Sequence, residues 1–407
     1  MKKTFLYFQP EYVGKFKCDG EKCNARCCKN WRIDIDAATY KKYSKLPEAQ
    51  EIISQIKFNE ELDKYIVTLD EKRFCPMLTE ENLCRLQKDH GEELLSVTCS
   101  TYPRHTKNFG KFFERALTPT CPVAAELILF QKEPMKFDFV EVPMKIHSNN
   151  GKISITNFSV PENDVAVFFE IQVAMISILQ ERRFTIDQRL IALGFFLDKL
   201  QELLSAKADK ETLMKSIGTY ESEDFLMNEL PPLIQSVQTD SEKFILFMLK
   251  FLKYTLDCLK SVEGRDFIKA FAEVLEIHPD EKSRVDVPKI ISKYESLAEA
   301  RKDFFEKYST VLENYFVNEF FMNVYPFRFA EENITKNFAV FMISYKIFEL
   351  MMFSATQNGL TSEKDLLRLV DWFTAKMDHN KNLFDRFFDL LKGIDDTFLL
   401  MTLLLKG

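Results

Sequence analysis

Eight of the nine cysteines of this chain lie within its first 121 residues. Their spacing is C-x4-C-x3-C-C and then C-x8-C-x14-C-x21-C, and they are Cys18, Cys23, Cys27, Cys28, Cys75, Cys84, Cys99 and Cys121. Thiolates bind soft or borderline metals, and several in one short segment can share a site. The segment therefore predicts a thiolate-rich metal site. The ninth, Cys258, stands among leucines and aromatic residues, which predicts a core cysteine acting as a small hydrophobe.

Three interpretations of the eight cysteines compete. A disulfide framework requires an oxidising compartment, but the apolar run after Lys2 and Lys3 ends at Gln9-Pro10, short of the roughly 7–15 residues of a secretory signal. We therefore expect a cytoplasmic protein. Two structural zinc sites would use all eight cysteines, although the C-x2-C knuckle of zinc ribbons is missing. We favour an iron–sulfur cluster with some cysteines left over, because proline follows Cys75 and Cys121, as it follows ligand cysteines in ferredoxins.

The rest of the chain predicts a mainly α fold. Glycine is scarce, at 11 residues, phenylalanine is abundant, at 39, and long stretches have helical periodicity. We expect a Cys-rich metal-binding domain over 1–130, a β-hairpin connector over 131–163 and a Phe-rich all-helical domain over 164–407. The hairpin is predicted from alternation in 137–142 and 153–156 around Asn149-Asn150-Gly151. The predicted helices cover 164–181, 186–204, 241–262, 296–323, 332–356, 362–377 and 381–404.

Within the Cys-rich domain the pattern predicts short helices and loops. Asp36 is the expected N-cap of a helix that begins at Ala37.

Charge and hydropathy exclude two classes of partner. Phosphate binding requires a basic surface, whereas this chain has a net charge of −7, so we do not expect a nucleic-acid partner. No segment forms the run of roughly 18 uncharged apolar residues that a membrane span needs, so none is expected. The phenylalanine-rich helices allow a hydrophobic interface, and hence a homo-oligomer.

Several motifs resemble those of the bacterial flagellin lysine-N-methylases, within the broader class of zinc- or iron-chelating proteins with a CxxCxxCC-like signature. The first is KCDGEKCNARCCKNWRIDID from Lys17 to Asp36. The match continues along nearly the whole chain, in FCPML (74–78), LCRL (83–86), CSTYPR (99–104), CP (121–122), ENYFVN (313–318), YPF (325–327) and DHN (378–380).

This resemblance implies transfer of a methyl group from S-adenosylmethionine to lysine side chains of flagellin, by a protein with a 4Fe-4S cluster. Zinc remains the alternative metal. Two common signatures of such chemistry are missing. No G-x-G exists for a doubly wound nucleotide-binding fold, and the C-x3-C-x2-C triad of radical S-adenosylmethionine enzymes is absent.

Methylation requires a deprotonated lysine aligned with the methyl–sulfur bond. The candidates for catalysis are Tyr102 and Arg104, which follow Cys99, then Glu313 and Tyr315 on one predicted helix, and His379 at a helix boundary. Asn314 and Asn318 on the same helix are candidates for binding the methyl donor. A structural role competes with each of these, since polar groups among phenylalanines also tie helices together and a lone histidine often caps one.

A different function class also fits the sequence. The chain could be a non-catalytic zinc- or iron-chelating module whose helical domain binds a protein partner, which the missing nucleotide motif favours. Binding of S-adenosylmethionine separates the two hypotheses, because a binding module needs no methyl donor.

Overall fold

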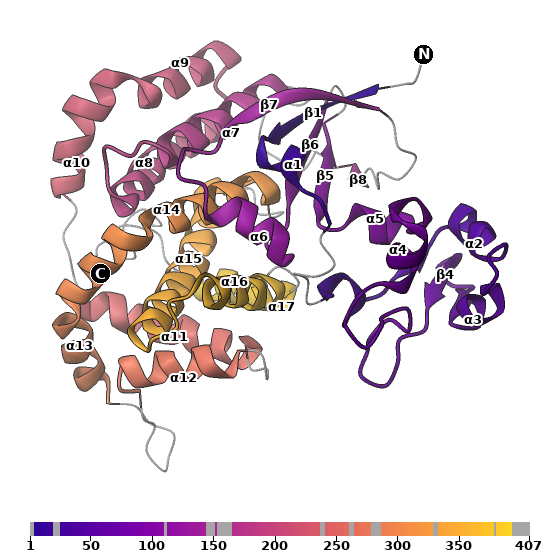
Figure 1. The fold of residues 1–407 in the computed structure, drawn as a ribbon. Coiled ribbons are helices and arrows are strands. Elements are labelled where there is room, and N and C mark those ends of the chain that lie inside the picture. The colour runs from indigo at the N-terminus through magenta and orange to yellow at the C-terminus, as the bar shows by residue number, and fades with distance from the viewer. Residues whose placement is uncertain are drawn as a thin grey trace. The chain divides into compact units, whose positions relative to one another are not determined.

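The computed structural model divides the chain into two compact units. The N-terminal unit consists of residues 1–128 and 136–153, and the C-terminal unit of residues 129–135 and 154–407. The chain therefore passes between the units three times (Figure 1). The structure describes residues 4–18, 25–109, 112–143, 151–152, 165–236, 241–259, 264–277, 286–328, 333–377 and 380–392.

The larger sheet of the N-terminal unit has the strand order β7-β1-β6-β5-β8. Its strands are β1 (Thr4–Pro10), β5 (Arg104–Asn108), β6 (Phe113–Leu117), β7 (Phe137–Pro143) and β8 (Gly151–Lys152). Strand β1 pairs antiparallel with β7 and parallel with β6, while β5 and β6 pair antiparallel. Alternate residues of a strand share a face. Accordingly, Tyr7 packs against Phe113 on one face, and Phe8 packs against Phe137 and Phe139 on the other.

The structure shows one partner of the predicted strand at 137–142. Residues 137–143 form a strand, and β7 pairs with β1 along its whole length, from Thr4 opposite Pro143 to Pro10 opposite Phe137. Phe8 packs on Phe137 and Phe139 across this pairing, and these cross-strand aromatic contacts stabilise it. The proposed second strand (153–156) and Asn149-Asn150 lie outside the described residues.

A smaller part of the N-terminal unit surrounds a second sheet of order β2-β4-β3, formed by β2 (Asp34–Ile35), β3 (Ile56–Asn59) and β4 (Lys64–Val67). Short helices accompany the two sheets: α1 (Tyr12–Lys15), η1 (Arg26–Cys28), α2 (Ala37–Tyr43), α3 (Ala49–Ser54), α4 (Arg85–His90), η2 (Glu92–Leu94), α5 (Val97–Thr101) and α6 (Pro122–Leu129). The N-cap prediction is confirmed, since Asp36 accepts a hydrogen bond from the Thr39 N–H.

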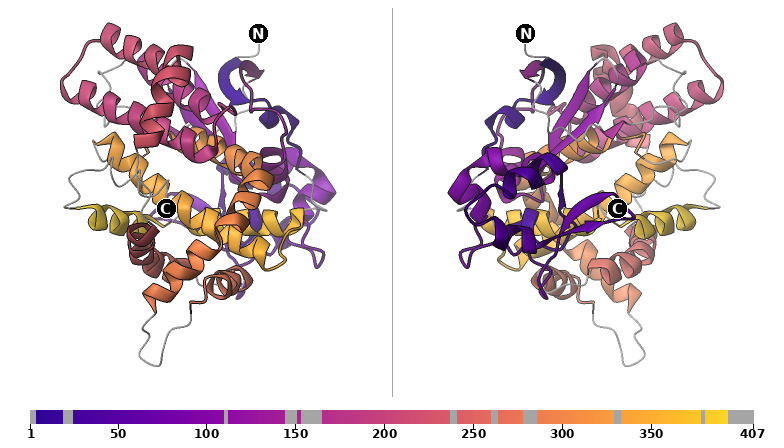
Figure 2. Two further views of the ribbon diagram at one scale, coloured as in Figure 1. Left: turned by 90° about the vertical axis from the view of Figure 1, so that its left-hand side faces the viewer. Right: turned by 90° about the vertical axis from the view of Figure 1, so that its right-hand side faces the viewer.

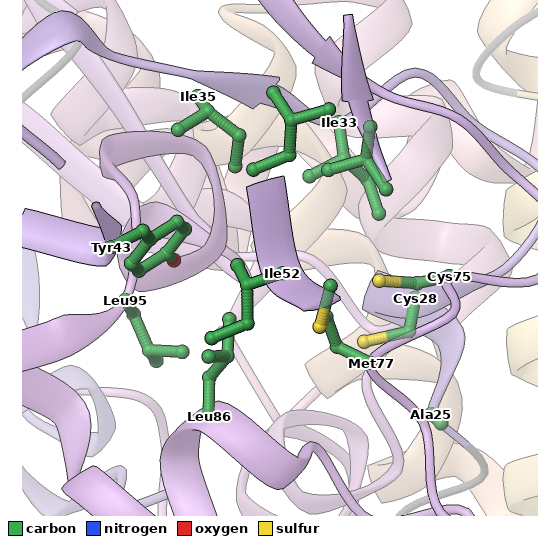
Figure 3. Close-up of a cluster of buried hydrophobic side chains, with 12 residues drawn as sticks. Ala25, Cys28, Ile33, Ile35, Tyr43, Ile52, Cys75, Met77, Leu86 and Leu95 are labelled. Atoms are coloured by element: carbon green, nitrogen blue, oxygen red, sulfur yellow. The ribbon is translucent and has the colours of Figure 1, made fainter. Parts of the chain in front are cut away.

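The core of this part is small and contains sulfur. Ile33, Ile35 and Ile52 pack with Tyr43 and Leu86, and Cys28, Cys75 and Met77 lie at one end of the same buried cluster (Figure 3). Cys28 and Cys75 are thus part of the hydrophobic core.

In the C-terminal unit every secondary-structure element of the described residues is helical, which confirms the expected helical C-terminal region. The helices are α7 (Val165–Leu179), α8 (Ile186–Ser205), α9 (Lys210–Glu221), a π-helical turn (Phe225–Glu229), α10 (Leu230–Ser236), α11 (Ser241–Leu259), α12 (Arg265–Val274), α13 (Val287–Ser296), α14 (Ala298–Asn323), α15 (Ile334–Gln357), α16 (Glu363–Met377) and α17 (Lys381–Leu391).

Most of the predicted helices recur with boundaries shifted by one or two residues. The start of α8 shows why, because Thr185 and Gln188 form a reciprocal capping box that fixes the first turn. Helices α9, α10, α12 and α13 were not predicted. The side chain of Cys258, on α11, and residues 393–404 of the last predicted helix lie outside the described residues.

Helix α15 is the central helix of this unit and packs against α8 and α12 (Figures 1 and 2). By length and composition it could cross a membrane, but 94% of its most apolar stretch is buried inside the protein. The central helix of a helical domain passes the same test.

Candidate functional site

Backbone hydrogen bonds bring three cysteine-bearing segments of the N-terminal unit together. The Cys75 N–H donates to the Cys28 carbonyl at 2.7 Å, beside a β-bridge between Lys29 and Phe74. A second bridge joins Leu78 to Cys84, where the Arg85 N–H donates to the Met77 carbonyl at 2.8 Å. The segments around residues 28, 75 and 84 are therefore held in register by the polypeptide itself.

The thiols of these segments gather around Cys28. The Sγ atoms of Cys27 and Cys28 are 3.8 Å apart. Hydrogen bonds to Cys27, Cys75 and Cys84, together with burial, raise the pKa of Cys28 far above that of an ordinary thiol. The same contacts lower the pKa of Cys27 and of Cys75, and they lower that of Cys84 to about 7. Cys28 is thus in contact with three thiols whose pKa values are lowered.

We call Cys27, Cys28, Cys75 and Cys84 the thiol cluster. Two further thiols lie at its edge. Cys99, on α5, has a pKa raised to about 12 by burial and by the charges of Cys84, Cys75 and Cys27. Cys18 is exposed, interacts electrostatically with Cys27 and Cys84, and lies 3.6 Å from Gln87 Oε1.

Two predicted ligands remain, Cys23 and Cys121. Cys23 lies outside the described residues. Cys121 is buried at the start of α6, where its charge acts on Arg104.

The thiol cluster fits a thiophilic metal by its donor chemistry. Among the described residues, no three Cys, His, Asp or Glu side chains are already arranged to hold one ion. However, four thiols share one small region, and three of them ionise easily. Several thiolates confined together need a compensating positive charge, which a metal centre supplies.

Tyr102 and Arg104 lie near these cysteines, in the N-terminal unit. The Trp31 indole donates to the Cys27 carbonyl at 2.7 Å, and the Trp31 ring lies 6.2 Å from that of Tyr102. The Tyr102 hydroxyl is 3.1 Å from Thr120 Oγ1, which is 3.0 Å from Thr118 Oγ1. The result is a chain of three hydroxyls that begins beside the thiol cluster.

The other predicted site residues belong to the C-terminal unit. Glu313 is almost fully buried on α14 and accepts hydrogen bonds from Arg182 at 2.8 Å and Arg189 at 2.6 Å. Arg189 also donates to the Leu179 and Phe184 carbonyls. Glu313 therefore ties the α7–α8 connection to α14.

Its neighbour Asn314 also ties segments together. The Asn314 amide donates to the Leu129 and Gln131 carbonyls, at 3.0 and 2.8 Å. Its side-chain oxygen is buried and has no hydrogen-bond partner among the described residues, which leaves one acceptor for a ligand or a water molecule.

Tyr315 and Asn318 complete the predicted set on α14. The Tyr315 hydroxyl lies 3.2 Å from Thr374 Oγ1, and its ring stacks on Phe348 at 4.4 Å. Asn318 is fully buried. His379 lies outside the described residues, and its neighbour Asn380 caps α17 through the Leu383 N–H.

A buried charged network in the C-terminal unit escaped the sequence analysis. Lys346 on α15 donates to Glu349 at 2.9 Å and to Asp187 at 3.1 Å, and both Lys346 and Glu349 are only 5% exposed. Two charges three residues apart in an otherwise apolar helical stretch were the signal that could have found it.

Comparison with known proteins places the chain in one class. Residues 172–405, within the helical part, match the family described as the FliB lysine N-methylase C-terminal domain. The chain therefore belongs to the FliB lysine N-methylase family. No solved structure matches it.

Curated relatives agree with the family over one segment. A lysine-N-methylase of Salmonella typhimurium is 33% identical over 139 residues, which are 33% of this chain and 35% of the relative. The flagellar biosynthetic protein FliU of Salmonella muenchen is 34% identical over 139 residues, 33% of this chain and 82% of FliU. The matched segment thus spans about a third of the lysine-N-methylase.

Proposed function

We propose that this chain is an S-adenosylmethionine-dependent protein-lysine N-methyltransferase that modifies flagellin in the cytoplasm and carries a cysteine-bound 4Fe-4S cluster. Lysine methylation is supported by the family and by relatives named lysine-N-methylase. A flagellar substrate is supported by the relative named flagellar biosynthetic protein FliU.

The observation that carries the metal part of the proposal is the gathering of Cys27, Cys75 and Cys84 around Cys28. These four thiols would hold the cluster, with Cys99 as a further candidate. When bound, the cluster would neutralise the thiolates and join the three cysteine segments covalently. Methyl transfer itself needs no redox step, so a structural cluster is sufficient.

The hydroxyls beside the thiol cluster provide a route for the substrate's proton. A lysine ammonium, with an ordinary pKa of about 10.4, must lose a proton before it can attack a methyl group. We assign Tyr102, in its phenolate form, as the acceptor, because a phenol ionises in nearly the same range as the lysine ammonium. Thr120 and Thr118 continue from Tyr102 by contacts of 3.1 and 3.0 Å and orient its hydroxyl.

One observation favours the second candidate, a non-catalytic metal-binding module. Glu313, Asn314 and Tyr315 all make contacts that tie helices or segments of the C-terminal unit together. A module of this kind would bind metal and a protein partner but no methyl donor.

The first test uses the full chain purified without oxygen. We expect an absorption band near roughly 400 nm, stoichiometric iron and sulfide, and transfer of labelled methyl from S-adenosylmethionine to flagellin. Colourless protein with tightly bound zinc would contradict the cluster. Metal-loaded protein that binds no methyl donor would favour the binding module.

Tyr102→Phe then tests the proton acceptor. We expect it to lower methyl transfer roughly 100-fold or more while iron content stays unchanged. Tyr65→Phe is the matched control, because Tyr65 belongs to the same unit and stacks on Tyr40 through its ring, which phenylalanine keeps. Full activity of Tyr102→Phe would remove Tyr102 from the reaction.

A further inference from the structure

Two arginines lie on the same face of the larger sheet in the N-terminal unit. In the antiparallel pairing of β5 and β6, Arg104 is opposite Leu117 and Thr106 is opposite Arg115. Arg104 and Arg115 are therefore diagonal neighbours, and their side chains project to the same side. Tyr7 on β1 and Phe113 on β6 share this face with them.

Both guanidinium groups rest on aromatic rings. The Arg115 Cζ atom lies 3.6 Å from the centre of the Tyr7 ring, and the Arg104 Cζ atom lies 5.0 Å from that of Phe16. Both side chains are half-buried. Aromatic faces can carry a cation, but they leave the N–H groups of the guanidinium fork available for an anion.

The two arginines lack an acidic partner within the part of the chain that the structure describes. Arg115 Nε is buried with no hydrogen-bond partner there, and the one hydrogen bond of Arg104 to the main chain, at 3.4 Å, goes to the Ser100 carbonyl. The adjacent Glu114 projects to the opposite face of the sheet. By contrast, the more exposed Arg182 of the C-terminal unit pairs with Glu313 at 2.8 Å.

Their positive charges are also destabilised in this position. Burial lowers the pKa of Arg104 despite the favourable charge of Glu92. Burial lowers the pKa of Arg115 as well; its interaction with Tyr7 opposes that shift, and the charge of Arg104 adds to it. Two half-buried like charges side by side favour an anion between them, and a guanidinium pair matches the planar geometry of a carboxylate.

We infer that Arg104 and Arg115 bind the carboxylate of the amino-acid part of the methyl donor. The inference rests on the proposed methyltransferase function, and it assigns residues of the N-terminal unit to the carboxylate of the donor. On the same face, the half-buried Phe5 ring packs edge-on against Phe113 and supplies apolar surface for the rest of the ligand.

The test compares two ligands that differ only in the carboxylate. S-adenosylhomocysteine and its decarboxylated analogue are titrated into the anaerobically purified full chain by calorimetry. We expect Arg115→Gln and Arg104→Gln each to weaken binding of S-adenosylhomocysteine roughly 10- to 100-fold and to leave binding of the decarboxylated analogue unchanged.

The matched control is Arg301→Gln in the C-terminal unit. The Arg301 Cζ atom lies 3.7 Å from the centre of the Tyr294 ring, so this substitution also removes a guanidinium stacked on tyrosine. We expect wild-type affinity for both ligands. If Arg115→Gln fails to fold, Arg115→Lys keeps the charge but removes the fork, and it should also discriminate between the ligands.

The outcomes separate this inference from the proposed function. If the wild type binds S-adenosylhomocysteine but the arginine variants weaken both ligands equally, or neither, the carboxylate site is overturned while the methyltransferase stands. If the wild type binds neither ligand, the proposed function itself fails, and the site fails with it.

Discussion

The carboxylate of Asp36 accepts a hydrogen bond from the Val97 N–H at 3.0 Å, across 61 residues of chain. The same carboxylate caps α2 through the Thr39 N–H at 2.9 Å. Val97 is the first residue of α5, the helix that carries Cys99. One side chain therefore holds the start of two helices and positions a cysteine beside the thiol cluster.

This arrangement predicts a pH-dependent stability. Burial alone would raise the pKa of Asp36, but hydrogen bonds from the Val97 N–H and from the hydroxyl and N–H of Thr39 outweigh it and hold the pKa below its ordinary value. The ionised cap therefore stabilises the fold above about pH 4, and this stability is lost as the pH falls through the lowered pKa. We expect Asp36→Ala to cost about 1–2 kcal/mol at pH 7, measured by denaturant unfolding, with a smaller difference at pH 3.

Asp209→Ala is its control, because Asp209 caps only α9. It should cost less than Asp36→Ala, and equal costs would show that the bond to Val97 contributes nothing.

The buried Glu313 offers a second prediction. Glu313→Gln leaves Arg189, itself only 4% exposed, without its charged partner. Removing one partner of a buried ion pair costs about 3–5 kcal/mol, so we expect a large loss in the free energy of unfolding. Glu223→Gln, which removes an exposed partner of Arg183, should have little effect. If Glu313→Gln instead kept full stability and lost methyl transfer, Glu313 would be a proton acceptor rather than a tie between helices.

A third prediction concerns Lys346. Burial raises the pKa of Glu349, and the charge of Lys346 opposes that rise. In Lys346→Met the pKa of Glu349 should rise further, so the variant becomes less stable as the pH increases through that pKa. We expect a loss of about 3–5 kcal/mol at neutral pH, partly recovered in the double variant Lys346→Met, Glu349→Leu. Unfolding at pH 5 and pH 8 measures both effects, and a pH-independent loss would contradict the role of Glu349.

The thiol cluster makes a fourth prediction. Cys28→Ser should remove most of the bound iron, because Cys28 contacts the thiols of Cys27, Cys75 and Cys84. Cys121→Ser should retain far more, since the structure places Cys121 beside Arg104, at the start of α6. Iron and sulfide analysis of the two variants, purified in parallel without oxygen, measures how much of the cluster each variant retains. Equal losses would show that Cys121 joins the ligand set.

The helical unit could largely be predicted from sequence because its signals are local. Apolar periodicity and side-chain caps lie within one turn of the helix that they define, as Thr185 and Gln188 show for α8. The four helices that were missed are shorter, at 7 to 12 residues, and their periodicity is correspondingly brief.

The sheets of the N-terminal unit could not be predicted in the same way, because their partners are distant in sequence. Tyr7 pairs with Phe113 and with Val140, and the residues next to Tyr7 in the sequence do not indicate either partner. The same holds for the thiols. Spacing predicted that the cysteines act together, but the backbone hydrogen bonds of the folded chain, such as that from Cys75 to Cys28, show which segments meet.

The threefold passage of the chain between the units limits how the protein can be divided. A fragment that begins at residue 172, where the family match begins, lacks residues 129–135. In it Asn314 would lose the Leu129 and Gln131 carbonyls, and Arg182 would lose the Lys132 carbonyl, to which it donates at 2.6 Å. Along the sequence, the chain first contributes residues 129–135 to the helical unit and then returns to form strand β7 of the larger sheet. Each half is therefore an incomplete folding unit when cut from the other, and ribosomal synthesis must reach residue 152, the end of β8, before all strands of the larger sheet exist.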